Sequence, residues 1–332
     1  MTKKIDVLGI GNAIMDVIVP VSDQALRDHD ITKGGMTLID ERRAVSLHTS
    51  LTKLGVPDEA AGGYAANTLD GRAELGAKGA YIGKDAKDAV GTRFTKGLMA
   101  AGLDYGTSPA QKGPASARCI IAVTPDGERS MSTFLGASSG LSPQDIKKTD
   151  IAAAQTIYLE GYLFDSKTSQ AAFVKAAKLA REANAEVALT LSDSFCVNMH
   201  RENFQNLVDN HVDILFANED ELLALYEKTD FDKAVKTLKK HCKTACITRG
   251  SKGSIILNKG QIHNIPAVSV DKVVDTTGAG DQYAAGILAG RAFGMDWEDA
   301  GYLGSLCASE VISHYGPRPE TSIHTLAMGI TH

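Results

Sequence analysis

A regular alternation of strand-like and helix-like segments between residues 156 and 248 restricts this chain to a small set of folds. Short apolar runs alternate with longer segments that have helical periodicity. The predicted strands are 157–159, 187–191, 212–216 and 245–248, and the predicted helices are about 168–183, 200–210, 219–227 and 231–241. Repeated βα units of this length form a parallel sheet with helices on both faces, and ligands bind such sheets at the carboxyl ends of the strands.

The first part of the chain predicts a further strand of this sheet and a second, smaller sheet. Ile5–Gly11 is a short apolar run ended by glycine, which is typical of a buried strand. More strand-like segments follow before residue 40, too close together to alternate with helices, and residues 117–135 read as a β-hairpin. We therefore predict one α/β domain, residues 1–332, with a small β lid from about residues 13–40 and 113–136.

Composition excludes several classes of protein. The 332 residues are 43% hydrophobic, which is enough for a sizeable core. A formal charge of −5 gives no basic field, so nucleic acid is not an expected partner. The cysteines are odd in number and lack paired CxxC spacing, which argues against a disulfide framework or structural zinc and favours reduced, mostly buried thiols.

No segment of the sequence predicts export or a membrane span. Asp6 falls inside what would have to be the apolar core of a signal peptide, and no apolar run approaches the ~18 residues that a bilayer requires. We expect a cytoplasmic protein that binds a small molecule. Either a monomer or a homodimer agrees with the sequence.

Two common phosphate-binding motifs are excluded. Residues 9–14 resemble the dinucleotide fingerprint GxGxxG, but Ile14 replaces the third glycine and a strand follows where that fold needs a helix. Residues 79–85 have three residues between the glycines where a P-loop has four, and Asp85 stands where Ser or Thr must bind magnesium.

A glycine-rich run before a predicted helix indicates an anion site. Gly278, Ala279 and Gly280 directly precede a helix predicted from Asp281 to about Phe293. The N–H groups of a helix N-terminus are unpaired, and together with the helix dipole they attract negative charge. For GxGD alone, an N-capped helix after a tight turn is an equally simple interpretation. Here the longer run DTTGAGD, residues 275–281, is present.

This run resembles the second signature, DTxGAGD, of the ribokinase-like (PfkB) family of carbohydrate and nucleoside kinases. Residues 62–67 and 75–83 are similar to the first signature, GGxxxN followed by LGAKxxxIG, and the resemblance extends over nearly the whole chain. It implies a ribokinase-like fold with a lid that closes over the sugar. It also implies transfer of a phosphoryl group from ATP, with Mg²⁺, to an alcohol.

The resemblance implies specific catalytic roles. Asp281 would be the general base for the substrate hydroxyl, and Gly278, Ala279 and Gly280 would form the anion hole for the transferred phosphoryl group. Arg129, at a Gly-Glu-Arg hairpin corner, would be a charge clamp on that group. The alternative for Arg129 is an exposed, inert arginine beside a turn.

Substrate-binding positions are also implied by the resemblance, and they are Asn12, Asp16, Gly62, Gly63 and Asn67. Asn12, Asp16 and Asn67 would bind sugar hydroxyls, while the glycines would let backbone amides approach. Asp16 at the solvent edge of a strand and Gly62-Gly63 as a plain loop remain the alternatives.

Phe195 bears on the choice of substrate. Leu191–Phe195 resembles the adenosine kinase branch, in which a phenylalanine stacks on the base; a core aromatic is the alternative. This favours adenosine, phosphorylated at its 5′-hydroxyl. Tyr64 and Leu163 depart from that branch, so ribose, fructose, inosine and guanosine stay open, as does a non-catalytic nucleoside or sugar sensor.

The remaining positions implied by the resemblance concern cofactors. Asn218 and Glu221 match NxxE, with Glu221 near Mg²⁺ through water, although acids also suit a helix start. Thr248, Gly250 and Gly253 match TxGxxG at the ATP phosphates. Asp275 and Thr277 match positions that hold potassium, an ion without which many nucleoside kinases manage.

Overall fold

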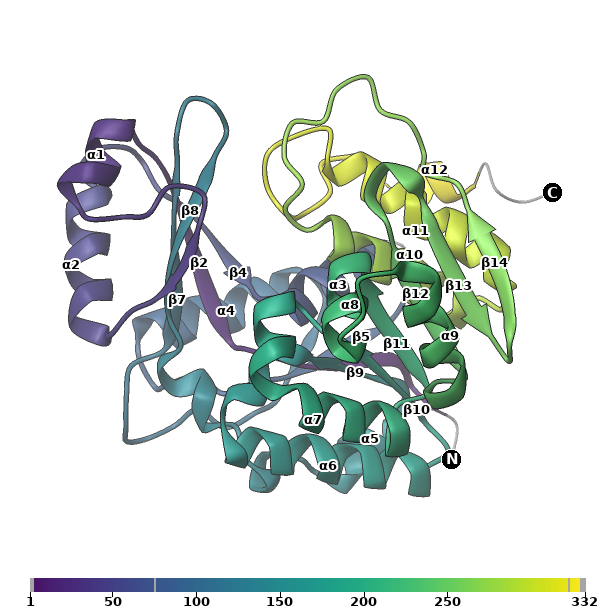
Figure 1. Ribbon diagram of the computed structural model, residues 1–332. Coiled ribbons are helices and arrows are strands. Elements are labelled where there is room, and N and C mark those ends of the chain that lie inside the picture. The colour runs from purple at the N-terminus through teal and green to yellow at the C-terminus, as the bar shows by residue number, and fades with distance from the viewer. Residues whose placement is uncertain (1–2, 75, 322, 329–332) are drawn as a thin grey trace.

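Two β-sheets organise the protein in the computed structural model, which describes residues 3–74, 76–321 and 323–328 (Figure 1). The larger sheet has nine strands in the order β14-β13-β12-β11-β10-β9-β1-β5-β6. Neighbouring strands from β6 to β12 in this order are parallel, and β13 and β14 are antiparallel. The strands are β1 Ile5–Ile10, β5 Gly79–Ile82, β6 Asp104–Tyr105, β9 Ala154–Glu160, β10 Glu186–Thr190, β11 Ile214–Asn218, β12 Thr244–Thr248, β13 Ser254–Asn258 and β14 Gln261–Ile265.

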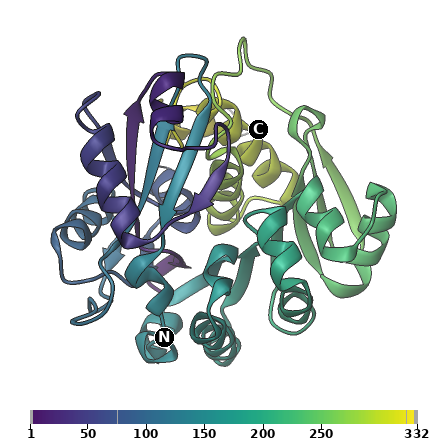
Figure 2. The same cartoon turned by 60° about the vertical axis from the view of Figure 1, so that its left-hand side comes forward.

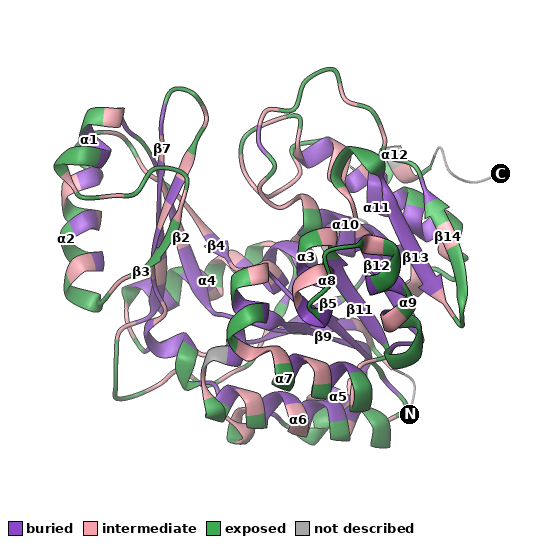
Figure 3. Ribbon diagram, in the orientation of Figure 1, coloured by how far each residue is buried: buried purple, intermediate pink, exposed green. Residues whose placement is uncertain are grey.

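Helices cover both faces of the large sheet, and this explains its continuous apolar strands. Leu8 and Leu159 pack on one face, with α5, α6, α7, α8 and α9, while Val7 and Tyr158 pack on the other, with α3, α4, α10 and α11. The central strands are therefore buried on both sides, as Figure 3 shows, whereas the edge strands β6 and β14 are largely exposed or half-buried. The helices are α3 Tyr64–Glu74, α4 Ala89–Ala100, α5 Lys148–Ala153, α6 Lys167–Glu182, α7 Ser194–Asn210, α8 Glu219–Tyr226, α9 Phe231–His241, α10 Ala279–Ala292, α11 Trp297–Val311 and α12 Ile323–Ala327.

The small sheet has one face covered by two helices and one inner face that carries Ile14, Cys119 and Ile121. Its order is β3-β8-β7-β2-β4. The helices α1, Asp23–Asp28, and α2, Glu41–Leu51, pack through Leu26, Leu47 and Leu51 against Val17 and Val19 of β2, on the outer side in Figure 2. The strands are β2 Ile14–Pro20, β3 Met36–Leu38, β4 Asp58–Gly62, β7 Ala117–Val123 and β8 Arg129–Phe134.

The structure confirms the predicted α/β architecture and enlarges it. The βα series lies where the periodicity placed it, but the series does not end at residue 248, because the hairpin β13–β14 extends the sheet by antiparallel pairing. Four strands of the small sheet lie inside the two predicted lid segments, whereas β4 and helix α2 lie outside them. The segment after Gly11 is a strand, in agreement with the exclusion of a dinucleotide fold.

The five cysteines are buried thiols that form no disulfide bond with one another. None of the helices in the described part of the chain is long and apolar enough to cross a membrane.

Candidate active site

A pocket of about 510 Å³ lies between the carboxyl edge of the large sheet and the inner face of the small sheet. Its volume is that of a site for a drug-sized ligand. Several lining residues end a strand of the parallel sheet, as the sheet topology predicts. These residues are Glu160, Thr190, Asn218 and Thr248.

The pocket gathers most of the predicted site residues from distant parts of the chain. The lining includes Asn12, Asp16, Gly63, Asn67, Arg129, Phe195, Asn218, Glu221, Thr248, Thr277, Gly278, Ala279, Gly280 and Asp281. Gly62, Gly250, Gly253 and Asp275 do not line it.

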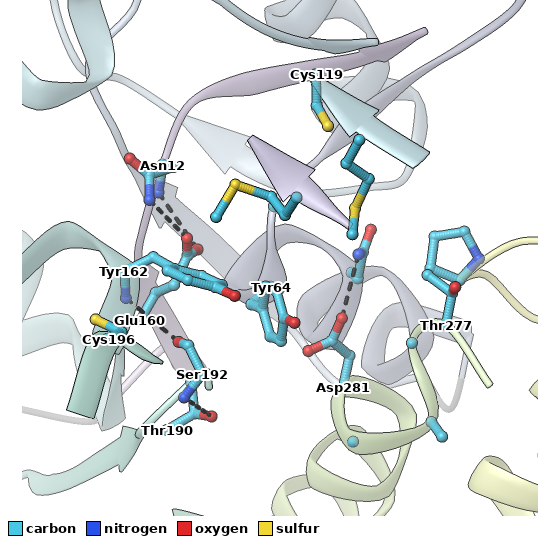
Figure 4. A pocket seen from close by; sticks show the side chains of 18 of the residues that line it. Asn12, Tyr64, Cys119, Glu160, Tyr162, Thr190, Ser192, Cys196, Thr277 and Asp281 are labelled. Atoms are coloured by element: carbon cyan, nitrogen blue, oxygen red, sulfur yellow. Dashed lines mark hydrogen bonds between the residues drawn. The ribbon is translucent and has the colours of Figure 1, made fainter. Parts of the chain in front are cut away.

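Asp281 is a buried carboxylate in the first turn of α10. It is 4% exposed, and Asn67 Nδ2 donates to its Oδ2 atom at 3.2 Å (Figure 4). Burial raises the pKa of Asp281 well above the ordinary carboxyl value, and the hydrogen bond from Asn67 opposes this shift. The nearby charges of Glu160, Asp16 and Glu221 raise the pKa further.

The glycine run before Asp281 forms an open helix N-terminus. Gly278 is the N-cap, with a left-handed φ of 77°. A Cβ at Gly278 would lie 2.6 Å from Pro317 Cα, so both conformation and packing require glycine there. A Cβ at Gly280 would meet no atom within 4 Å among the described residues. The backbone beside Asp281 is therefore open at Gly280, where an anion could approach, whereas the Ala279 N–H already donates to Thr276 O at 3.2 Å.

The end of the pocket beside Asp281 is rich in hydrogen-bond acceptors. Asp16 is half-buried, and the loss of water around its carboxyl group raises its pKa to about 7 against the lowering effect of Arg318 and Arg129. Asn67 Oδ1 is buried without a hydrogen-bond partner in the part of the chain that the structure describes. Gly62 does not line the pocket, but it leaves room for the Asp16 side chain. A Cβ at Gly62 would lie 2.2 Å from the Asp16 carboxyl group.

Other residues that line the pocket are apolar or aromatic. Phe195, the second residue of α7, is 61% exposed, which excludes the alternative of a core aromatic. Met199 lies one turn further along α7 and also lines the pocket. Tyr64 and Tyr162 pack edge to face with ring centroids 5.1 Å apart, and the Tyr162 hydroxyl donates to Asp193. The small sheet adds Ile14, Met36, Leu38, Ile121 and Met131.

Arg129 is a buried residue of the lid and not an exposed one. Its side chain is 9% exposed, and its Nη1 atom lies 3.3 Å from Asp275 Oδ2. Nε and Nη1 of Arg129 have no hydrogen-bond partner within the described residues. A buried guanidinium with unpaired donors is suited to an incoming anion.

The same contact bears on the predicted potassium position. Asp275 accepts from Thr277 N and Gly316 N, each at 3.0 Å, and it also faces the Arg129 guanidinium. These donors and the guanidinium charge hold the Asp275 pKa below its usual value despite burial. A potassium ion at this carboxylate would have to displace a fixed cation, so the residues present fit an ion pair better than a metal.

The residues of the predicted ATP side divide into two groups. Asn218 caps α8 and forms a capping box with Glu221, whose pKa burial raises to about 7. Both side chains line the pocket together with Thr248. Gly253 has a different constraint, because a Cβ there would lie 2.1 Å from Ile265 O. Gly250 and Gly253 turn the chain between β12 and β13, and their contact with ATP stays a prediction.

Sequence reasoning missed Glu160. This carboxylate ends β9, is 1% exposed and lines the pocket, and burial raises its pKa to about 7. Its position at the carboxyl end of a predicted strand was the available signal. No sequence motif surrounds Glu160, so only its neighbours in the folded protein identify it as a residue of the site.

The fold and the site together define a small-molecule kinase, an enzyme that transfers a phosphoryl group to a hydroxyl group. A glycine-rich helix N-terminus lies beside a buried carboxylate in one pocket between the two sheets, an arrangement suited to phosphoryl transfer. The chain belongs to the PfkB family: the family described as pfkB family carbohydrate kinase matches residues 29–323.

Solved structures and curated relatives agree with this membership. The crystal structure of adenosine kinase from Sinorhizobium meliloti is 44% identical, with a TM-score of 0.90, and the match covers 99% of this chain and 100% of that one. A probable sugar kinase from Rhizobium etli CFN 42 is 43% identical, with a TM-score of 0.91 and full coverage of both chains. Adenosine kinase from Saccharomyces cerevisiae is 26% identical over 93% of this chain and 95% of its own.

Proposed function

We propose that this kinase phosphorylates the 5′-hydroxyl of a purine nucleoside, adenosine first, to give AMP. One observation carries the proposal: a single pocket has both hydrogen-bond acceptors beside Asp281 and a set of apolar side chains. A ribose donates hydroxyl protons to the acceptors, and a purine covers the apolar side chains. Free ribose or fructose would leave the apolar side chains in water, which is unfavourable.

The proposed reaction uses the chain's own groups for proton transfer and charge stabilisation. Asp281 accepts the proton of the attacking hydroxyl, and its bond from Asn67 orients it. The N–H groups of residues 278–280 and the Arg129 guanidinium stabilise the transferring phosphoryl group. Bound Mg²⁺ would offset charge on the ATP phosphates, and Glu221 and Asn218, which line the pocket, would hold its water molecules. Thr248 and the turn through Gly250 and Gly253 would face the ATP phosphates.

The relatives support adenosine but keep other acceptors open. The Sinorhizobium meliloti protein carries the name adenosine kinase, whereas the Rhizobium etli protein is a probable sugar kinase. Ribose, fructose, inosine and guanosine are therefore alternative acceptors. A non-catalytic sensor is disfavoured, because a sensor has no use for a buried carboxylate beside an open helix N-terminus.

The proposal extends to organisation and setting. Residues 1–332 would work as one ribokinase-like unit whose small sheet closes over the substrate, as a monomer or homodimer. Conversion of adenosine to AMP would place the enzyme in purine salvage in the cytoplasm.

The test is ATP consumption against a panel of nucleosides and free sugars at equal concentration, with Na⁺ or K⁺ as the monovalent cation. We expect adenosine to give the highest kcat/KM, and we expect no effect of exchanging the cation, because Arg129 supplies the charge beside Asp275. Faster turnover of ribose or fructose would assign a sugar kinase instead. A strict need for K⁺ would show that an ion displaces the guanidinium.

Phe195→Ala should weaken the binding of nucleosides without affecting free sugars. Stacking of a base on an aromatic ring is worth about 1–3 kcal/mol, so the KM for adenosine should rise by about 5- to 150-fold. Any turnover of free sugars should be unchanged. Phe293→Ala is the matched control, because Phe293 is also exposed but does not line the pocket. An equal loss for nucleosides and sugars in Phe195→Ala would contradict stacking.

A further inference from the structure

The Glu160 carboxylate accepts hydrogen bonds from three N–H groups that belong to two separate segments. It lies at the sugar end of the pocket, which is the end beside Asp281 where the ribose is proposed to bind. Its Oε1 atom accepts from Asn12 Nδ2 at 2.8 Å, and Oε2 accepts from Asn12 N at 3.3 Å and from Ala65 N at 3.0 Å. Figure 4 shows the two bonds from Asn12, one from its side-chain Nδ2 and one from its backbone N, to the Glu160 carboxylate. The last residue of β9 therefore fixes both the segment after β1 and the start of α3.

The surrounding backbone is shaped to admit this carboxylate. A Cβ at Gly11 would lie 2.3 Å from Glu160 Oε2, so a larger residue at position 11 would displace the acid. Gly63 adopts a left-handed φ of 96°, and a Cβ there would lie 2.8 Å from Asn12 O. Tyr81 donates its hydroxyl to that same Asn12 carbonyl at 2.9 Å. Asn12 is thus held through its backbone as well as its side chain.

The chemistry of a carboxylate decides which way the Asn12 amide points. Glu160 in its ionised form only accepts hydrogen bonds, so the NH₂ group of Asn12 faces it and donates to Oε1. The Oδ1 atom then lies on the other side of the amide. Asn12 consequently presents its Oδ1 atom to a substrate hydroxyl as an acceptor, beside the second hydrogen of its NH₂ group.

We propose that Glu160 is a positioning residue for the sugar: it orients the Asn12 amide so that this side chain accepts a hydrogen bond from a ribose hydroxyl. The inference rests on the proposed function, since the ligand of Asn12 is taken to be the ribose of a nucleoside. It adds an orienting residue behind the sugar contact. Together with Asp16 and Asn67 Oδ1, it makes the sugar end a set of acceptors that selects hydroxyl donors.

Glu160→Gln tests the role of the carboxylate. Glutamine keeps the shape, but its own NH₂ group then opposes one of the three donors. A lost charge-assisted hydrogen bond is worth about 1.5–3 kcal/mol, so the KM for adenosine should rise by about 10- to 150-fold. The kcat and the KM for ATP should change little. An unchanged KM for adenosine in a folded Glu160→Gln protein would overturn the proposal.

Combining Asn12→Asp with Glu160→Gln should restore part of the adenosine binding that each single substitution loses. In Asn12→Asp alone, two carboxylates would face each other and binding should fail. In the double variant Asn12→Asp with Glu160→Gln, the glutamine NH₂ donates to the new aspartate, whose other oxygen still accepts from the ribose. The affinity of the double variant for adenosine should be about tenfold or more higher than the affinity expected if the losses of the two single variants were independent. Additive losses would contradict the proposed orientation.

Substrate analogues test the orientation in the unmodified enzyme, independently of whether a variant folds. Replacing the 2′- or 3′-hydroxyl of adenosine by fluorine removes the donor and keeps a weak acceptor. At least one of the two analogues should bind about tenfold or more weakly than adenosine. Equal affinity for adenosine and both fluoro analogues would show that no acceptor is presented to the sugar.

Asp88→Asn is the matched control. Asp88 also accepts from a helix start, Gly91 N, and from a distant segment, Ser116 N and Oγ, but it lies outside the pocket lining. It should lower thermal stability without changing the KM for adenosine.

Failure of the proposed function and failure of the proposed role of Glu160 give different results. If the unmodified protein does not phosphorylate nucleosides, the proposed function fails; if it does and the Glu160 variants bind adenosine normally, only this inference fails.

Discussion

Asp281→Asn is expected to bind adenosine nearly as well as the unmodified protein and to phosphorylate it about 10²–10⁴-fold more slowly, the loss typical of a missing general base. The asparagine carbonyl can still accept from Asn67, which lies 3.2 Å from Asp281 Oδ2. It cannot take up a proton from the substrate hydroxyl. The loss should therefore appear in kcat, measured by product formation at saturating adenosine and ATP.

Stability separates this chemical loss from unfolding. Asp281 is buried close to Glu160, Asp16 and Glu221, and these charges and its burial all disfavour the ionised form. A neutral asparagine removes that cost, so the variant should melt at the same temperature as the unmodified protein or higher. A variant with undiminished kcat would remove Asp281 from the mechanism.

The pH dependence of the unmodified enzyme should have the same origin. Burial raises the Asp281 pKa, so the protonated form, which cannot act as a base, persists to higher pH than for an ordinary carboxyl group. The kcat/KM for adenosine should rise with pH, with its acid limb above the ordinary carboxyl range, because kcat/KM reports the free enzyme. A profile that is flat down to about pH 5 would contradict a raised pKa for the base.

Arg129→Ala should lower kcat by about 10²–10³-fold, a loss comparable to that of one anion-stabilising donor. The Arg129 side chain is buried and lines the pocket, and two of its nitrogen atoms have no hydrogen-bond partner in the described structure. The KM for adenosine should change less than kcat, because the charge acts on the transferring phosphoryl group. Arg129→Lys keeps a charge but not the planar fork, and it should recover only part of the rate.

Arg118→Ala provides the control for the lid. Arg118 belongs to β7, which pairs with β8, and its neighbour Cys119 lines the pocket while Arg118 does not. Successive side chains of a strand point to opposite faces, so this variant removes an arginine from the other face of the same sheet. It should keep full kcat. Equal losses in both variants would assign Arg129 to the stability of the lid.

Most of the fold could be predicted because its strands and helices depend on local patterns in the sequence. The strands and helices between residues 156 and 248 follow from apolar periodicity and turn residues, which act over a few positions. The hairpin β13–β14 and strand β4 were missed because their place in a sheet depends on distant partners. β4, for example, pairs with β2 across more than one helix of the lid.

The candidate site was predictable where residues stand in a continuous motif. Gly278 to Asp281 and Gly63 to Asn67 are such runs, and the pocket contains both. Phe195 and Arg129 had two interpretations each, and only burial separated them: Phe195 is exposed in the pocket, and Arg129 is buried beside Asp275. Glu160 had no motif and was found only through its neighbours.

The sequence by itself determined the order of βα units, the glycine-rich N-terminus of α10 and the family, because these depend on short-range conformational preferences and on residues adjacent in the chain. The tertiary structure alone decided that Asp16, Glu160, Glu221 and Asp281 share one pocket and that burial raises the pKa of each. The pKa of a carboxyl group is set by the water it loses and the charges it meets, and both come from segments far away in the chain.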